Sequence, residues 1–153
     1  MSDHILALLI GIIAGLRALM PLAAVSWAAR LGRLPLDGTW LAFFGYAATP
    51  YITSFLAAFE LFNDKRPTTP SRKIPPQFIT RIVTGALSGA ALTTPASGPV
   101  GGLIAGAIGA VISTLGGAVM RATLAKSFGK DLPAALLEDA IAVAGAFLVA
   151  FSV

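Results

Sequence analysis

Long apolar segments alternate with short polar ones along the whole chain. An α-helix needs roughly 20 apolar residues to cross a membrane core. Five segments approach that length: about Ile5–Met20, extended past Pro21 by Leu22–Ala29; about Trp40–Phe62; about Phe78–Thr94; about Val100–Leu124; and about Pro133–Phe151. The pattern predicts an all-α membrane protein with about five transmembrane helices, forming a single transmembrane domain over residues 1–153.

Composition strengthens this prediction. Hydrophobic residues make up 56% of the chain, its mean hydropathy is +0.83, and charged residues make up only 12%. A soluble domain carries about 25% charged residues. A short soluble chain leaves much of its surface exposed, so it cannot hide this much apolar area. A bilayer is therefore the expected surrounding.

Two stretches share one pattern of small residues and proline at a constant offset. Gly11, Gly15 and Pro21 in the first recur as Gly85, Gly89 and Pro95 in the second. The pattern predicts a first repeat over about 5–62, a second over about 78–124 and an extra helix over about 133–151, with proline-broken helices in matching positions. Such repeats are typical of transporters. Coincidence in a chain rich in glycine and alanine is the alternative.

The polar connections suggest a topology. Segment 63–77 reads NDKRPTTPSRKIPPQ and holds four of the eleven basic residues; segment 126–131 is also basic, and 95–99 is uncharged. Basic loops favour the cytoplasmic side. The N-terminus is then inside, the C-terminus outside, and the repeats run parallel. Arg30 and Arg33 fall on the wrong side, which a re-entrant Leu22–Gly32 segment or a different number of spans would resolve.

Several classes of chemistry are excluded. The net charge of +4 would suggest nucleic acid in a soluble protein, but here it fits basic loops beside a membrane, so no nucleic-acid partner is expected. The chain has no cysteine and one histidine, His4, which rules out thiolate catalysis and a multi-histidine metal site within one chain. No metal and no cofactor are predicted, and the usual hydrolase and phosphate-loop motifs are missing. The sequence favours a protein that is not an enzyme.

Arg17 is the first candidate site residue. It lies deep in the first apolar segment, four residues before Pro21. A charge near the middle of a membrane costs a few kcal/mol and usually faces the bundle interior with a partner. Arg17 and Pro21 are therefore predicted to line a binding site or pathway. A structural ion pair, or an arginine that reaches an interface, is the alternative.

Carboxylates supply the expected partners. Glu60 and Asp64 share a helix face, and Glu138 and Asp139 follow Pro133 in the last segment. They are predicted partners for Arg17, Arg81 and Arg121, and they could relay protons or form a polar site. Because Glu138 and Asp139 are adjacent, only one of them is expected to face inward. Pairing of Glu60 and Asp64 with basic neighbours at the membrane surface is the alternative.

The loop after the second segment could bind a phosphate or a lipid head group. Its basic residues are Lys65, Arg66, Arg72 and Lys73. An ordinary basic anchor on the cytoplasmic side explains the same residues. In the fourth apolar segment, Gly102 and Gly106 form a GxxxG pattern that permits close helix packing within one chain or between protomers, so a homo-oligomer is one further expectation.

Two motifs carry a resemblance to a known family. The stretches Gly15-Leu16-Arg17 through Pro21 and Glu60-Leu61 through Asp64-Lys65, with looser support from Leu132-Pro133 and Glu138-Asp139, resemble a bacterial domain-of-unknown-function family of small multi-span membrane proteins. The resemblance implies a multi-pass protein of the bacterial inner (cytoplasmic) membrane. It also marks Arg17, Glu60, Asp64 and Lys65, and it implies no substrate.

Three functions remain open from the sequence. The leading hypothesis is a small transporter or channel-like protein for a small anion or a proton-coupled solute, with its pathway near Pro21 and Pro95. The first alternative is a protein that binds or modifies lipid head groups through the loop around Lys65. The second is an accessory or assembly protein without transport activity.

Overall fold

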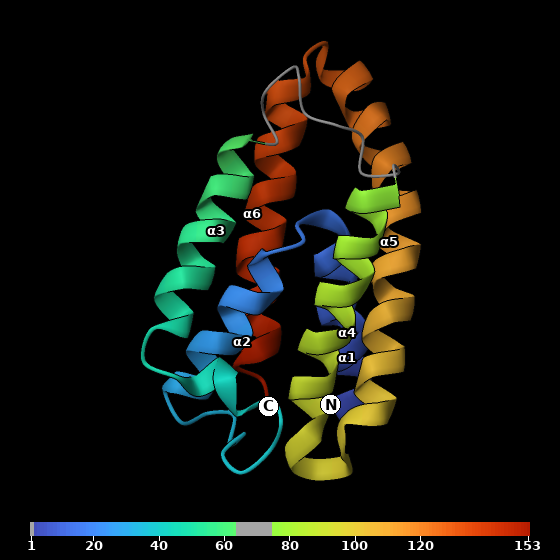
Figure 1. Ribbon diagram of the computed structural model, residues 1–153. Coiled ribbons are helices and arrows are strands. Elements are labelled where there is room, and N and C mark those ends of the chain that lie inside the picture. The colour runs from blue at the N-terminus through green and yellow to red at the C-terminus, as the bar shows by residue number, and fades with distance from the viewer. Residues whose placement is uncertain (1, 64–74) are drawn as a thin grey trace.

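The computed structural model describes residues 2–63 and 75–153, and these segments are helical, without a strand (Figure 1). The elements are α1 (Asp3–Leu16), α2 (Met20–Arg30), the short 3-10 helix η1 (Ala42–Gly45), α3 (Thr49–Asn63), α4 (Pro75–Ser97), α5 (Pro99–Phe128) and α6 (Asp131–Ala150). The all-α prediction is confirmed for the described residues.

The first predicted span is two helices rather than one. α1 ends at Leu16, and Arg17 has an extended backbone with φ −141° and ψ 111°. Pro21 lies in the first turn of α2, where its missing N–H costs nothing. Helices of 14 and 11 residues are about 21 and 16 Å long, roughly two thirds and one half of a membrane core. Figure 1 shows the break in the middle of the molecule, with α2 running back toward the end where α1 begins.

Other helix limits also differ from the sequence prediction. The segment from Trp40 is irregular up to α3, apart from η1, so the second helix begins at Thr49. Pro95 does not break its helix, because α4 continues through it to Ser97. The helix ends instead at Gly98, whose φ of +87° is a conformation that glycine adopts readily.

The two termini lie at the same end of the molecule, together with the α4–α5 turn, and the α5–α6 connection lies at the other end (Figure 1). The prediction of termini on opposite sides is therefore wrong, because α2 returns to the end where α1 starts. α1 and α4 run in opposite directions, so the two similar stretches are antiparallel and not parallel. Arg30 is the last residue of α2 and Arg33 follows it, at the end of the molecule opposite the basic α5–α6 connection.

Helices α1, α4 and α5 form what we call the glycine-packed group. A Cβ atom added to Gly106 of α5 would lie 2.0 Å from the carbonyl oxygen of Gly85 in α4. One added to Gly11 of α1 would lie 2.1 Å from the carbonyl oxygen of Gly106. Backbones this close leave room only for hydrogen. The predicted close packing at Gly102 and Gly106 is confirmed, and it occurs within one chain.

Helices α2, α3 and α6 form what we call the outer group, in which α2 contacts both α3 and α6, while α6 also packs against α1 and α5. The indole N–H of Trp27 in α2 donates to Ser54 Oγ in α3 at 2.8 Å. Its ring meets that of Tyr51 edge-on, with centroids 5.2 Å apart. Between the two groups, Gly145 of α6 faces Ile13 of α1, where an added Cβ would lie 2.7 Å from Ile13 Cδ1.

The outer surface is apolar on several helices. Exposed fractions reach 71% for Phe55 of α3, 68% for Val100 of α5 and 70% for Leu148 of α6. Among the described residues, α5 and the segment Leu132–Ala150 are long and apolar enough to cross a membrane, and α1 is a shorter apolar helix. These features resemble those of a membrane protein.

Candidate functional site

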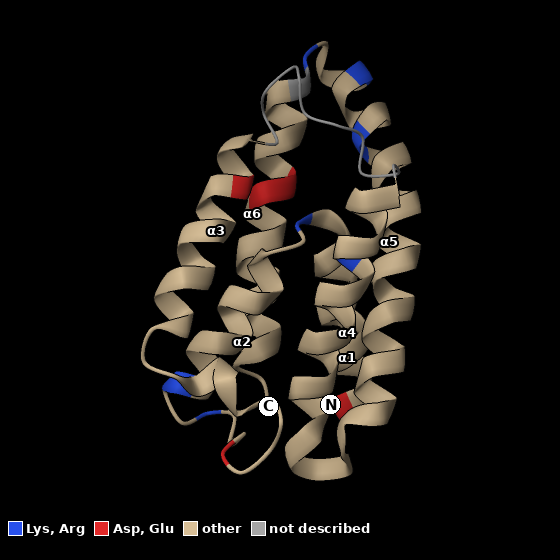
Figure 2. Cartoon of the chain, in the orientation of Figure 1, with Lys and Arg blue, Asp and Glu red and all other residues tan. Residues whose placement is uncertain are grey.

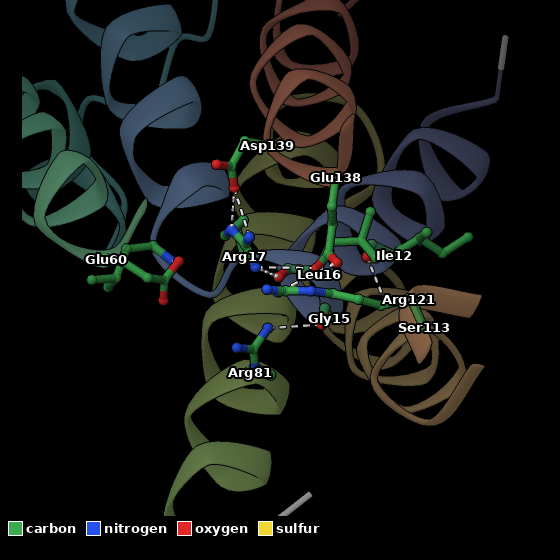
Figure 3. A network of polar contacts seen from close by, with 11 residues as sticks. Ile12, Gly15, Leu16, Arg17, Glu60, Arg81, Ser113, Arg121, Glu138 and Asp139 are labelled. Atoms are coloured by element: carbon green, nitrogen blue, oxygen red, sulfur yellow. Dashed lines mark hydrogen bonds and ion pairs between the residues drawn. The ribbon is translucent and has the colours of Figure 1, made fainter. Parts of the chain in front are cut away.

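Arg17 is completely buried at the break between α1 and α2. Its Nε donates to Asp139 Oδ1 at 2.7 Å, and its Nη2 lies 2.6 Å from the same oxygen. Its Nη1 donates to Glu138 Oε1 at 3.1 Å and to the carbonyl oxygen of Leu16 at 2.9 Å. The guanidinium therefore joins the broken end of α1 to α6 through short, charge-assisted contacts (Figure 3).

Both acidic residues of α6 face inward, which corrects the expectation that only one would. Glu138 and Asp139 are 7% and 8% exposed. Adjacent helical side chains point about 100° apart, but the broad guanidinium of Arg17 presents different nitrogens to each. One arginine thus contacts both carboxylates, with Nε and Nη2 on Asp139 and Nη1 on Glu138.

Glu138 also faces a second cation. Arg121 Nη1 of α5 lies 3.7 Å from Glu138 Oε2, beyond the 2.7–2.9 Å of a direct charge-assisted hydrogen bond. The side chain of Arg121 is 16% exposed and that of Glu138 is 8% exposed. Glu138 therefore lies between two guanidinium groups, one in close contact and the other looser and more accessible.

Charged side chains also hold the two ends of the helix break. Arg81 of α4, only 3% exposed, donates from Nη1 to the carbonyl oxygen of Gly15 at 2.8 Å. Glu60 of α3 accepts from the backbone N–H of Leu19 at 3.3 Å. A cation at the C-terminus of α1 and an anion at the N-terminus of α2 both complement the helix dipoles.

These six residues, Arg17, Glu60, Arg81, Arg121, Glu138 and Asp139, form what we call the charge layer. The cations come from the glycine-packed group: Arg17 ends α1, and the other two lie on α4 and α5. The carboxylates come from the outer group, on α3 and α6. Figure 2 shows the acidic positions of α3 and α6 at a similar height. Opposite charges therefore meet across the boundary between the two groups.

A cavity of about 50 Å³ lies beside the charge layer. Arg121 and Glu138 contribute the charged part of its lining, and Leu16, Leu137 and Ile141 are among its apolar walls. One water needs about 10–15 Å³ measured in this way. The cavity has room for a few water-sized groups, and it is open to the outer surface, because Leu137 and Ile141 are themselves 43% and 50% exposed.

The structure unites some predicted site residues and leaves others aside. Arg17, Glu60, Arg81, Glu138 and Asp139 gather at the break, and Pro21 begins the helix beyond it. Pro95 lies at the end of the molecule, away from this site (Figure 1). Asp64, Lys65, Arg66, Arg72 and Lys73 fall outside the described residues. No three of the His, Asp and Glu residues that the structure describes gather closely enough to hold a metal ion.

Sequence reasoning missed the backbone half of the site. The carbonyl oxygen of Gly15 and the N–H of Leu19 become partners only because the helix breaks between them. The available signal was a charged residue followed by Pro21 within an apolar segment, which allows a helix to stop at the charge. Arg121 was considered only as a partner for carboxylates, and its place beside a cavity could not be read from spacing.

The described site lies inside a single family match. The family model for a domain of unknown function, DUF4126, matches residues 5–152. The chain belongs to the DUF4126 family. The match covers both helix groups and the whole charge layer, so the DUF4126 domain is the entire helical structure rather than one part of it. No curated protein and no solved structure matches the chain.

Proposed function

We propose that this DUF4126 protein is a small carrier of the bacterial inner membrane that moves a small anion or a proton-coupled solute. The supporting observation is the charge layer, in which four of the six residues are buried; it lies at a helix break and is divided by sign between two helix groups. Buried charges and broken helices at a boundary between helix groups are the features that transporters use at their binding sites.

The membrane setting rests on helix length and surface chemistry. α5 and Leu132–Ala150 can each cross a bilayer, and apolar side chains on α3, α5 and α6 face outward. In this proposal α3 to α6 cross the membrane, and α1 and α2 form a re-entrant pair that turns at Arg17. Irregular backbone at membrane depth is tolerated where protein surrounds it, and Arg17 is fully buried.

Transport would require the two groups to separate on either side of the charge layer in turn. The glycine-packed group would move as one body, because its backbones are in contact. Contacts such as Arg121 with Glu138, at 3.7 Å, would open and close as the outer group moves. A charge pair that forms in only one of the two conformations would stabilise that conformation and so shift the equilibrium between the two.

A substrate-independent test is the chemical accessibility of the site. The chain has no cysteine, so Leu16→Cys places a single thiol in the cavity wall. In membrane vesicles of both orientations, a hydrophilic, membrane-impermeant thiol reagent should label this cysteine. A pathway requires water at this position.

Two matched variants calibrate the result. Ser127→Cys, in the exposed last turn of α5, should react freely from one side. Leu92→Cys, at a fully buried position of α4, should not react. If Leu16→Cys is as inert as Leu92→Cys in vesicles of both orientations, the charge layer is sealed and serves stability rather than transport.

A further inference from the structure

We propose that segment 30–48, which we call the aromatic segment, is a binding surface for the head groups of anionic phospholipids. Trp40 and Tyr46 lie at the boundary between head groups and acyl chains, and Arg30 and Arg33 bind the lipid phosphate. This inference rests on the membrane setting of the proposed function and not on transport itself. Its own evidence is the place of the segment in the fold, its exposed aromatic rings and the charges beside them.

The aromatic segment lies at an end of the helix bundle. It runs from the last residue of α2 to the residue before α3, at the end of the molecule that carries both termini and the α4–α5 turn (Figure 1). In the membrane setting proposed above, helices that cross the bilayer stop at this end. The aromatic segment therefore faces lipid head groups rather than the centre of the acyl chains.

Buried apolar residues fix the aromatic segment on the bundle. Leu34, Leu36, Leu41 and Phe44 are each at most 2% exposed. Between them, the hydroxyl of Thr39 donates to the carbonyl oxygen of Leu36 at 2.6 Å, and the N–H of Phe44 donates to that of Leu41 at 3.1 Å. Irregular backbone is tolerated near a membrane when its polar groups are paired. The segment therefore has a defined outer face that needs no rearrangement to meet lipid.

The outer face of the segment carries amphipathic rings. Trp40 and Tyr46 are 56% and 62% exposed. Such rings are enriched at both membrane–water interfaces, where the apolar part meets acyl chains and the polar atom meets water or head groups. Exposed residues nearer the middle of α5, such as Ile108 and Ile112, are aliphatic instead. The change from aliphatic side chains to Trp and Tyr is what a boundary between acyl chains and head groups favours.

The end of α2 lies beside these rings. Gly45 packs against Ala29, the residue before Arg30, because a Cβ atom added to Gly45 would lie 3.7 Å from Ala29 Cβ. Tyr46 follows Gly45 in the chain, and both Tyr46 and Arg30 are exposed. Arg30 and Tyr46 therefore place a cation and an amphipathic ring close together on one part of the surface.

The second cation is oriented by the C-terminal residues. The guanidinium of Arg33 lies over the ring of Phe151, 5.9 Å from its centroid. The one acid of the aromatic segment, Asp37, leaves the segment with an excess of one positive charge. A lipid phosphate complements that excess, and the planar guanidinium suits its oxygens. Each arginine near a membrane surface should raise the association constant for anionic lipid about fivefold, or about 1 kcal/mol.

The first test is the depth of Trp40 in liposomes that contain brominated lipids, measured by fluorescence quenching on the full-length protein. The chain has two tryptophans, so Trp27→Phe leaves Trp40 as the only one. Bromine atoms high on the acyl chains should quench Trp40 at least about twofold more strongly than bromine atoms near the chain ends. The matched reference is Trp27→Phe/Trp40→Phe/Ile112→Trp, at a position of α5 that is 58% exposed, and it should show the reverse order.

The second test is the preference of this site for anionic lipid, measured by quenching of Trp40 with brominated phosphatidylglycerol and brominated phosphatidylcholine in mixed liposomes. Arg33→Gln should reduce the preference for phosphatidylglycerol about fivefold. Asp37→Asn should increase it, because a charge that repels phosphate is removed. Lys126→Gln removes an exposed cation near the other end of the molecule and should leave it unchanged. Opposite signs for Arg33 and Asp37 distinguish recognition of charge from a general loss of structure.

A spin label keeps the test decisive if Trp27→Phe does not fold. The chain has no cysteine, so Tyr46→Cys carries a single label, which should be accessible both to oxygen and to a water-soluble nickel complex. A label at Ile112→Cys should be accessible to oxygen alone. Three results would each overturn the inference: stronger quenching of Trp40 by deep bromine atoms, a label at Tyr46→Cys that oxygen does not reach, or equal losses of lipid preference in Arg33→Gln and Lys126→Gln.

These measurements fail independently of the proposed function. A preference for phosphatidylglycerol that depends on Arg33, together with an inert Leu16→Cys, would establish the lipid surface and contradict the carrier. A reactive Leu16→Cys, together with a Trp40 that is quenched from water and not by brominated lipid, would support the carrier and contradict the lipid surface.

Discussion

The two helix groups of this protein are held together by different means. In the glycine-packed group, α1 and α4 lie against α5 with backbones so close that an added Cβ would come within 2.0–2.2 Å of a carbonyl oxygen at Gly106, Gly11 and Gly102. In the outer group, α2 meets α3 through side chains such as Trp27, Ser54 and Tyr51. Close approach at small residues and hydrogen bonds between side chains are two different ways of holding membrane helices together.

Charge follows the same division. The glycine-packed group carries the arginines of the charge layer and the outer group carries its carboxylates. The ion pairs of Arg17 and Arg121 with α6 join the two groups, whereas Arg81 and Glu60 contact backbone groups on their own side of the boundary. A boundary held by charge pairs can open when those pairs are weakened, whereas backbone packing cannot be adjusted by a ligand.

Arg17→Met should cost about 3–5 kcal/mol of stability, because it leaves Glu138 and Asp139 buried with their closest cation removed. Denaturant unfolding in detergent measures this cost. The control is Arg30→Met, an exposed arginine at the end of α2, which should change stability by less than about 0.5 kcal/mol. Similar losses in the two variants would show that the charge layer does not hold the groups together.

Gly106→Ala should destabilise the protein by about 1–3 kcal/mol, because the new methyl group meets the backbone of α4, which cannot move aside as a side chain would. Its matched control is Gly116→Ala on the same helix, where nothing lies within 4 Å of the added Cβ. That substitution should be neutral or stabilising, by up to about 1 kcal/mol. Thermal unfolding of both variants distinguishes these outcomes, and equal melting temperatures would refute close packing around Gly106.

Glu60→Ala should cost about 1 kcal/mol, since it removes both the acceptor for the N–H of Leu19 and a negative charge at the N-terminus of α2. Glu60→Gln keeps an acceptor oxygen and should recover part of that loss. Denaturant unfolding of the two variants gives the comparison. If Glu60→Gln is the less stable variant, the carboxylate does not act as a cap for α2.

Trp27→Phe should have the smallest effect, about 0.6 kcal/mol, the average for an interhelical side-chain hydrogen bond in a membrane protein. It removes the donor to Ser54 while keeping an aromatic ring beside Tyr51. The loss of stability in the double variant Trp27→Phe/Ser54→Ala should not exceed the sum of the losses in the two single variants. A loss as large as that of Gly106→Ala would show that the outer group is as tightly packed as the glycine-packed one.

Most helices could be predicted from the sequence, whereas the break between α1 and α2 could be predicted only in part. Apolar segments located α4, α5 and α6, because helix length and apolar length coincide there. Pro21 and Pro95 have the same local signal but different places in their helices. Pro21 lies in the first turn of α2, where proline is tolerated, whereas Pro95 lies in the last turn of α4, which ends soon after it at Ser97. Arg17, Glu138 and Asp139 were identified by the rarity of charge in apolar segments, but their mutual contacts depend on tertiary structure.

The most direct test of independent movement is a pair of distance distributions measured by electron–electron double resonance in liposomes. Spin labels at Ser127→Cys of α5 and Phe59→Cys of α3 span the two groups, and labels at Ser127→Cys and Ile79→Cys of α4 lie within the glycine-packed group; all three positions are exposed. A carrier built from these groups predicts two resolved distances across the boundary, with populations that shift between acidic and alkaline buffer, and one unchanged distance within the glycine-packed group. A single narrow distance for both pairs in every buffer would contradict it.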